Sequence, residues 1–210
     1  MQKITPEHGG KREQIIAAAR KMFFEKGFDG VTIRAVQREV GCEVGLFYYY
    51  FKSKDEVFEV IFDQLEEEWA KGFEKAAKNA EADPTDAARK IFEHIQKCGN
   101  ALTKESGGKM HWSVEKAAYS RIAKAAEPFV RDIIKAMKNF GAVNSGLSPE
   151  TLAMVAAAGI GRLVLSEGKS SKELLMQGLS AFELLLSASD MRTKVREEKS
   201  ARREISVELL

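Results

Sequence analysis

The sequence has few of the residues on which most catalytic and metal sites depend. Its 210 residues include only three histidines and two cysteines. Cys42 and Cys98 lack the spacing of metal ligands, and the chain contains no HExxH motif, glycine-rich phosphate loop or Ser/His/Asp pattern. His111 and Glu115 are four residues apart but have no evident third ligand. We therefore expect no enzyme activity, no metal site and no cofactor.

The chain also lacks hydrophobic segments that would target or anchor a protein. No apolar run approaches the roughly 20 residues that a membrane-spanning helix needs, and even the segment 152–165 contains Arg162. The first ten residues, MQKITPEHGG, have no apolar core of the kind that a secretory signal requires. With so few cysteines, this pattern indicates a cytoplasmic protein without a membrane partner.

A large excess of charge of one sign is absent too. The formal net charge is +2, so bulk attraction cannot hold a polyanion to the whole molecule. The charge is unevenly distributed, because residues 1–54 contain ten Lys or Arg and only six Asp or Glu. The next stretch, residues 55–93, is acidic. Any nucleic-acid binding is therefore expected from a local patch near the N-terminus.

The spacing of apolar residues predicts an all-α protein of about nine helices. Ile15, Ala19 and Phe23 mark one face of a first helix that ends at Gly27. Local signals mark other boundaries. Predicted helix starts lie at Thr32, the Ser53/Glu56 capping box, Asp83-Pro84, Pro128, Ser148-Pro149 and the Ser170/Glu173 capping box. Predicted breaks lie at Gly41, Gly107-Gly108 and Gly141.

Residues 32–51 have the proportions of a helix-turn-helix, the motif whose second helix enters the DNA major groove. The second helix carries the run LFYYYF, in which Phe47 and Phe51 can pack inward together. The residues that this leaves facing outward are Val44, Leu46, Tyr48, Tyr49 and Tyr50. Tyrosine hydroxyls commonly donate to phosphate oxygens, so the outward face favours DNA binding over packing alone.

The segment 11–60 resembles the TetR family of bacterial transcriptional regulators. The resemblance rests on the helix IIAAARKMFFEKGFDG, the Thr32 cap and the segment VGCEVGLFYYYFKSKDEVF. It implies a three-helix DNA-binding domain followed by a larger helical domain that binds a ligand and forms dimers. Carried onto this chain, the family's DNA contacts fall on Thr32, Arg34, Val44, Gly45, Leu46, Tyr48, Tyr50 and Lys54, with Tyr49 beside them on the outward face.

These positions imply different roles. Arg34 would read a base edge by hydrogen bonding, whereas the apolar Val44 and Leu46 suit thymine methyl groups. Thr32, the tyrosines and Lys54 would hold the phosphate backbone. Two residues depart from the family pattern, since Gln37 replaces the usual alanine and Glu43 a common serine. We expect Glu43 to cap the second helix rather than to contact DNA, because a carboxylate repels phosphate.

The predicted domains are a DNA-binding domain (1–54), a helical ligand-binding and dimerisation domain (55–189) and a charged C-terminal extension (190–210). Small residues in the helix that starts at Pro149, followed by Leu175, Gly178, Phe182 and Leu185, predict a homodimer contact, with an intrachain core as the alternative. Candidate ligand-pocket residues, each of which suits the core as well, are Phe73, Phe92, His94, Trp112, Tyr119 and Met154. Arg162 would meet a ligand carboxylate or pair with Glu167.

Together these features predict a sequence-specific transcriptional regulator, a dimeric repressor released from a palindromic double-stranded DNA operator by a small apolar or amphipathic effector. One alternative is a helical protein-interaction module whose helix-turn-helix does not bind DNA. Binding that is insensitive to the loss of Tyr48 and Lys54 would favour that module. The other is an enzyme in the helical domain, which turnover by protein lacking residues 1–54 would favour.

Overall fold

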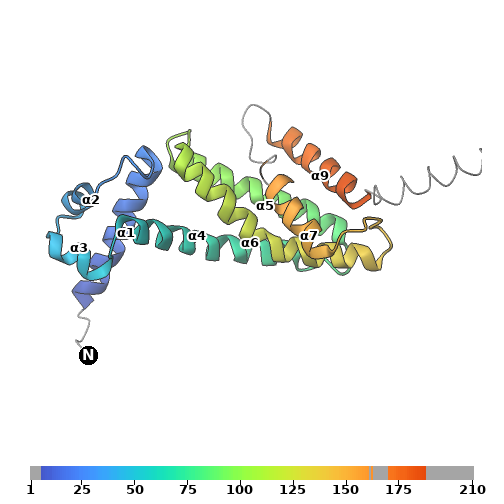
Figure 1. Ribbon diagram of the computed structural model, residues 1–210, viewed down its shortest axis with the longest axis horizontal. Helices are drawn as coiled ribbons and strands as arrows, with labels where there is room; N and C mark the ends of the chain where they lie inside the picture. Colours follow the sequence, from blue (N-terminus) through green and yellow to red (C-terminus); the bar gives the residue numbers. More distant parts are fainter. Residues whose placement is uncertain (1–5, 161, 163–169, 188–210) are drawn as a thin grey trace, which may run out of the picture. The chain divides into compact units, whose positions relative to one another are not determined.

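The computed structural model describes residues 6–160, 162 and 170–187, and within that part of the chain every regular element is helical. The described residues form eight α-helices, which are labelled in Figure 1: α1 (Pro6–Lys26), α2 (Ile33–Val40), α3 (Val44–Tyr50), α4 (Lys54–Ala77), α5 (Pro84–Glu105), α6 (Trp112–Asn139), α7 (Pro149–Val155) and α9 (Ser171–Ser187). A π-helical turn, η1 (Ala156–Ile160), follows α7. The predicted all-α class is confirmed, with about the predicted number of helices.

The described residues pack as two compact units. The first contains the residues up to Phe73 together with His94–Ala125, and the second contains Glu74–Glu93 together with the residues from Ala126 onward. These are packing units, so the functional boundary at residue 54 stays a prediction. The proposed extension 190–210 lies outside the described residues. None of the described helices is long and apolar enough to cross a membrane.

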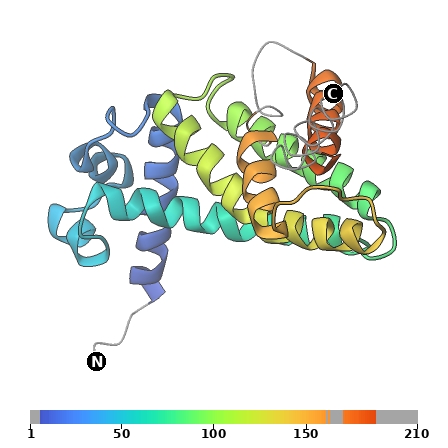
Figure 2. The same cartoon turned by 45° about the vertical axis from the view of Figure 1, so that its right-hand side comes forward.

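Aromatic side chains dominate the core of the first unit. Figure 2 shows α1, α2 and α3 grouped together, with α2 and α3 on one side of α1. From α1, Phe23 and Phe24 are each 1% exposed, and Phe24 stacks on Phe62 of α4 with ring centroids 6.3 Å apart. Burial of such a side chain stabilises the fold by about 1.5–3 kcal/mol. The stacked rings of Phe24 and Phe62 therefore fix α1 against α4.

The second unit contains α9 and the part of α6 from Ala126 onward. α6 buries Val130, Ile133 and Ile134. Phe182 of α9 packs edge-on against Phe92 of α5, with ring centroids 5.5 Å apart. Gly178 and Phe182 are thus buried within the protomer, which supports the intrachain alternative for that part of α9.

Most of the predicted helix boundaries are confirmed by capping hydrogen bonds. Predicted N-cap side chains accept from backbone N–H groups at Thr32, Ser53, Asp83, Ser148 and Ser170. Gly41 adopts a left-handed conformation (φ 63°) at the end of α2, as predicted. The Ser53 box differs in one bond, because the Glu56 carboxylate accepts from the N–H of Lys52.

Two predictions about helix boundaries are wrong. Glu43 occupies the N-cap position of α3, but its side chain forms no capping hydrogen bond. Pro128 does not begin a helix, because α6 runs through it from Trp112 to Asn139. Proline removes one backbone donor from a helix. The buried side chains of Ile122 and Val130, on either side of it, keep the helix continuous through tertiary packing.

The turn between α1 and α2 is held at Phe28 from several sides. The N–H of Phe28 donates to Oγ of Ser113 at 3.0 Å, and its carbonyl accepts from Nζ of Lys54 at 2.8 Å. The Lys54 ammonium also lies 4.1 Å from the centroid of the Phe28 ring. Phe58 packs edge-on against the same ring at 5.0 Å. Phe28 therefore joins the turn to α4 and to the start of α6.

Gly27, which ends α1, is predicted to tolerate substitution less than Gly41. Both have positive φ, 74° and 63°, so alanine at either site costs about 1–2 kcal/mol. A Cβ on Gly27 would also lie 2.1 Å from Nδ1 of His111, whereas one on Gly41 would meet nothing within 4 Å. We expect Gly27→Ala to lower the free energy of unfolding by a further ~1–3 kcal/mol, measured by urea denaturation. Equal losses for the two variants would contradict the close approach of His111.

Lys54 is predicted to stabilise the fold, and Lys52 provides the matched control. Lys54→Ala removes the bond to the Phe28 carbonyl and the cation–π contact, so we expect a loss of about 1–3 kcal/mol in the free energy of unfolding. Lys52 is exposed and engages Glu56 only through its backbone N–H, so Lys52→Ala should change stability by less than about 0.5 kcal/mol. The same denaturation assay measures both, and equal effects would argue against the Lys54 contacts.

Candidate nucleic-acid interface

The turn between α2 and α3 is fixed by Gln37. This side chain is only 5% exposed, and its Nε2 donates to the carbonyl of Val44 at 3.4 Å. The carbonyl of Gln37 accepts the N–H groups of Gly41 and Cys42. Gln37, which stands where the family usually has alanine, therefore has a structural role, since it ties the end of α2 to the start of α3.

The outer surface of α3 is aromatic and carries no charge of its own. Phe47 and Phe51 are 1% exposed, as predicted, and anchor the helix to the core. Val44, Tyr48 and Tyr49 are 56%, 53% and 59% exposed. Large apolar and aromatic side chains that stay exposed side by side on a short helix are typical of a binding surface.

Ring contacts fix the orientation of the tyrosines. Tyr49 and Tyr50 meet edge-to-face with centroids 4.9 Å apart, and Tyr48 packs edge-on against Phe47 at 5.6 Å. Partial desolvation and the neighbouring Tyr49 raise the pKa of the Tyr50 hydroxyl above its ordinary value of 10.0. This hydroxyl is therefore protonated at neutral pH and able to donate a hydrogen bond to a phosphate oxygen.

The surface of α3 is unobstructed at Gly45. It is exposed, its φ is not positive, and a Cβ added there would meet nothing within 4 Å. Nothing in the protomer therefore requires glycine at this position, and alanine would be the better helix former. A glycine without a structural reason permits a partner to approach the backbone closely.

The polar residues predicted to contact DNA are either exposed or already bound within the protomer. Thr32, the N-cap of α2, and Arg34 on α2 are exposed. Oγ1 of Thr32 accepts from the N–H of Ala35 at 3.2 Å, and its hydroxyl proton remains available as a donor. Lys54 is half-buried and already bound to Phe28, so a phosphate would have to share its ammonium. Arg38, which is not among the predicted DNA contacts, is also exposed, one turn after Arg34. Their i, i+4 spacing in the sequence indicates that the two side chains share one face of α2.

The predicted ligand-pocket residues of the first unit do not form one cavity. Phe73 is fully buried and packs edge-on against His94 at 4.7 Å. Nε2 of His94 lies 3.2 Å from the carbonyl of Trp69 and 3.6 Å from Sγ of Cys98. Burial lowers the pKa of His94 and raises that of Cys98 to about 12. This arrangement is a neutral, closely packed part of the core.

Trp112 and Tyr119 lie elsewhere in the first unit. Trp112 is 61% exposed and lines a hollow of about 310 Å³ beside Phe28 and Phe58. The Tyr119 hydroxyl donates to Glu115 at 2.7 Å, and Nδ1 of His111 contacts Oγ of Ser113. Among the described residues, no three His, Cys, Asp or Glu side chains are placed to hold one metal ion.

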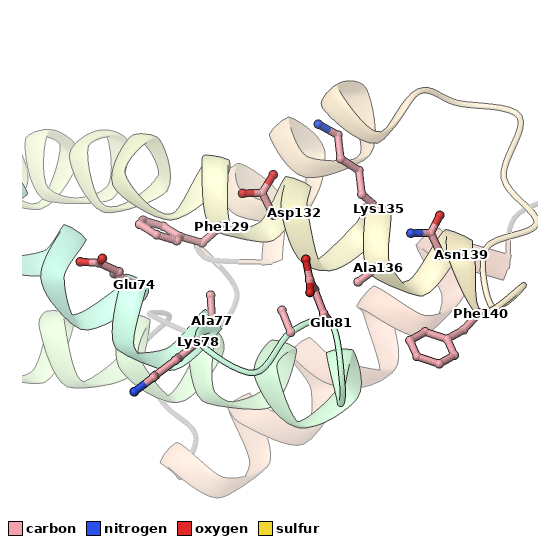
Figure 3. Close-up of a pocket in the computed structure, with 11 residues that line it drawn as sticks. Glu74, Ala77, Lys78, Glu81, Phe129, Asp132, Lys135, Ala136, Asn139 and Phe140 are labelled. Atoms are coloured by element: carbon pink, nitrogen blue, oxygen red, sulfur yellow. The ribbon is translucent and has the colours of Figure 1, made fainter.

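The remaining candidates belong to the second unit and are also dispersed. Phe92 packs against Phe182, Met154 is 54% exposed on α7, and Arg162 is exposed. Its proposed partner Glu167 lies outside the described residues. The larger cavity is elsewhere: a hollow of about 730 Å³ between the ends of α4 and α6, shown in Figure 3. In the sequence, its charged lining residues look like ordinary solvent-exposed helix faces, so the sequence alone does not predict this hollow.

Comparisons with known proteins agree on the N-terminal segment. Residues 15–61 match the family described as bacterial regulatory proteins, tetR family. The HTH-type transcriptional regulator YfiR of Bacillus subtilis is 36% identical over 78 residues, which cover 37% of this chain and 38% of YfiR. The HTH-type transcriptional repressor Rv1474c of Mycobacterium tuberculosis is 34% identical over 59 residues, covering 28% and 32% of the two chains. The matches thus span only about a third of the length of these relatives.

The fold is similar over a longer part of the chain. A transcriptional regulator of the TetR/AcrR family from Thermobifida fusca superimposes with a TM-score of 0.58, covering 86% of this chain and 99% of that chain at 20% identity. At that identity, the likeness establishes the fold alone. The family match covers the helix-turn-helix that exposes the α3 surface. Residues 15–61 therefore belong by sequence to the tetR family of bacterial regulatory proteins, and the chain has the fold of TetR-family proteins.

Proposed function

We propose that this cytoplasmic regulator is a repressor that binds a palindromic operator as a homodimer and leaves it when a small molecule binds. The observation that carries the DNA-binding part is the surface of α3, where Phe47 is buried and Val44, Tyr48 and Tyr49 are exposed. The helix is anchored from one side and offers the other to a partner.

Both helices of the helix-turn-helix take part in base reading and in phosphate binding in this proposal. Arg34 on α2 supplies the hydrogen bonds to a base edge, and Val44 and Leu46 contact thymine methyl groups. Gly45 allows α3 to lie close to the bases. The phosphates are held by Thr32, Tyr48, Tyr49 and Tyr50. The Lys54 ammonium adds to them through the N–H groups that it does not donate to the Phe28 carbonyl.

Dimerisation is proposed through the exposed apolar residues of the second unit. Met154 and Val155 on α7 are 54% and 43% exposed, and Met176 and Leu184 on α9 are 56% and 71% exposed. Met176 and Leu184 are eight residues, or about two helical turns, apart. Contact of this surface with its own copy would generate the two-fold symmetry that a palindrome requires.

The alternative of a protein-interaction module uses the same exposed rings. It gives no reason for Gly45, which no contact in the protomer requires, or for the exposed Arg34 and Arg38 on the adjacent helix. A basic and aromatic surface on a helix-turn-helix is better matched to a nucleic acid than to an apolar protein groove. We therefore favour DNA.

The DNA-binding proposal predicts that selection from a pool of random duplexes enriches a palindrome with half-sites about 34 Å apart, or a multiple of that. Arg34→Gln should weaken binding to the enriched duplex by about 1–3 kcal/mol and relax the preference at one position of each half-site. Fluorescence anisotropy at a fixed salt concentration measures the first effect, and repeated selection measures the second.

Lys71→Gln is the matched control, because it removes one charge from an exposed position of α4 away from the helix-turn-helix. It should leave the sequence preference unchanged. If no duplex enriches at low salt, the helix-turn-helix does not read DNA as proposed and the interaction module becomes the better account. If the two variants behave alike, Arg34 on α2 does not read a base edge as proposed.

The dimer proposal predicts that the wild type sediments at twice the protomer mass of 23.4 kDa. Met176→Glu combined with Leu184→Glu would bury charge in the contact, so we expect monomers at micromolar concentration by analytical ultracentrifugation. Trp112→Glu, which changes an equally exposed residue of the first unit, should remain dimeric. A monomeric wild type, or a dimer that survives the double substitution, would show that this surface is not the contact.

A further inference from the structure

The hollow between the ends of α4 and α6 has the size of a ligand site. Its volume of about 730 Å³ lies within the range of roughly 300–1,000 Å³ that small-molecule pockets occupy. All of its walls belong to the second unit. The residues used below come from the last turns of α4 and α6 and from the loop after α4.

Three carboxylates and two ammonium groups line this hollow, and two of the three carboxylates form no ion pair within the described part of the chain. Glu74 and Glu81 are exposed and form no ion pair within the described part of the chain, while Asp132 lies 3.6 Å from Arg131. Figure 3 shows Glu81 extending from the loop toward α6. Such unpaired carboxylates favour a positively charged occupant.

The two lysines in the lining do not cancel this charge. In Figure 3 the amine of Lys78 points away from α6, and that of Lys135 points away from the hollow. Nζ of Lys135 lies 3.9 Å from the carboxylate of Glu150, outside the lining. The ammonium groups are therefore directed elsewhere while Glu81 extends across the hollow.

Two helix ends add negative potential from the backbone. α4 ends at Ala77 and α6 at Asn139, and both residues line the hollow. The last carbonyl groups of a helix carry the negative end of its dipole, which favours cations within about one turn. The backbone and the carboxylates thus act with the same sign.

Aromatic rings form the apolar part of the walls. Phe140 is 64% exposed, and Phe129 lies between Glu74 and Asp132 in Figure 3. The face of a phenylalanine ring attracts an organic cation, and the half-buried Phe129 presents such a ring near two of the carboxylates. The ring also provides a surface for the apolar body of such a molecule.

From these observations we infer that the hollow binds an organic cation with an aromatic or aliphatic body, such as a substituted ammonium. The inference rests on the proposed function, since it assigns a chemical class to the effector of that proposal. Glu81 and Glu74 attract the charge, the helix ends reinforce it, and Phe140 covers the apolar part. An inorganic cation would leave the rings unused, and an anion would meet repulsion from Glu74, Glu81 and the two helix ends.

The test uses three small probes of similar size and different charge: benzyltrimethylammonium, benzyl alcohol and phenylacetate. Binding to the full chain is followed by ligand-observed NMR titration at constant ionic strength. We expect benzyltrimethylammonium to bind with a Kd of roughly 1 mM, and phenylacetate to bind at least about tenfold more weakly. Glu81→Gln should weaken cation binding about fivefold, and Phe140→Leu about threefold.

Glu67→Gln is the matched control, because Glu67 is an exposed residue of α4 that does not line the hollow. Its variant should bind the cation like the wild type. The inference is overturned if the cation does not bind at 20 times the expected Kd, roughly 20 mM, if phenylacetate binds equally well, or if Glu67→Gln and Glu81→Gln weaken binding equally.

The effect on DNA is measured separately, by anisotropy with the enriched duplex and with NaCl at equal ionic strength as the control for salt. A fall in DNA affinity with benzyltrimethylammonium, absent in Glu81→Gln, supports both the site and its role as effector site. If the cation binds but DNA affinity is unchanged, the site stands and release by this class of effector fails. If no duplex is bound at all, the proposed function fails while the cation titration still decides the site.

Discussion

The attachment of the turn at Phe28 is the constraint on which the position of the reading helices depends. Its N–H is held by Ser113, its carbonyl by Lys54 and its ring by Phe58, so α4 and the start of α6 both contact this one residue. None of these contacts uses the outward face of α3. These contacts therefore leave Tyr48 exposed to a partner. They also bind the Lys54 ammonium to the Phe28 carbonyl, so it is only partly available to such a partner.

Because α3 carries no charged side chain, electrostatic attraction to DNA would have to come from the neighbouring helices. α3 offers rings and apolar side chains, which suit sugars and methyl groups but would neutralise no phosphate. The cations of α2, Arg34 and Arg38, are exposed beside it. In the proposed complex the electrostatic attraction would therefore come from α2, and Gln37 fixes the relation of α2 to α3 through its bond to Val44.

Local hydrogen bonds made much of this fold predictable, and tertiary packing made the rest unpredictable. The caps at Thr32 and Gly41 follow from short-range chemistry that a sequence displays directly. Pro128 looked like a helix start, but the packing of residues on both sides of it keeps α6 continuous. The same limit applied to the polar Gln37, whose burial depends on the turn that it holds.

The candidate site divides in the same way. The outward tyrosines could be assigned because Phe47 and Phe51 fix the inward face of a short helix. Ligand-pocket residues could not, since an aromatic residue such as Phe73 suits a core as well as a cavity wall. The inferred cation hollow was hidden for the opposite reason, because charged residues at helix ends look like solvated surface. For such a cation, Coulomb attraction alone would strengthen binding to DNA, so release has to come from a shift between conformations that bind the cation unequally.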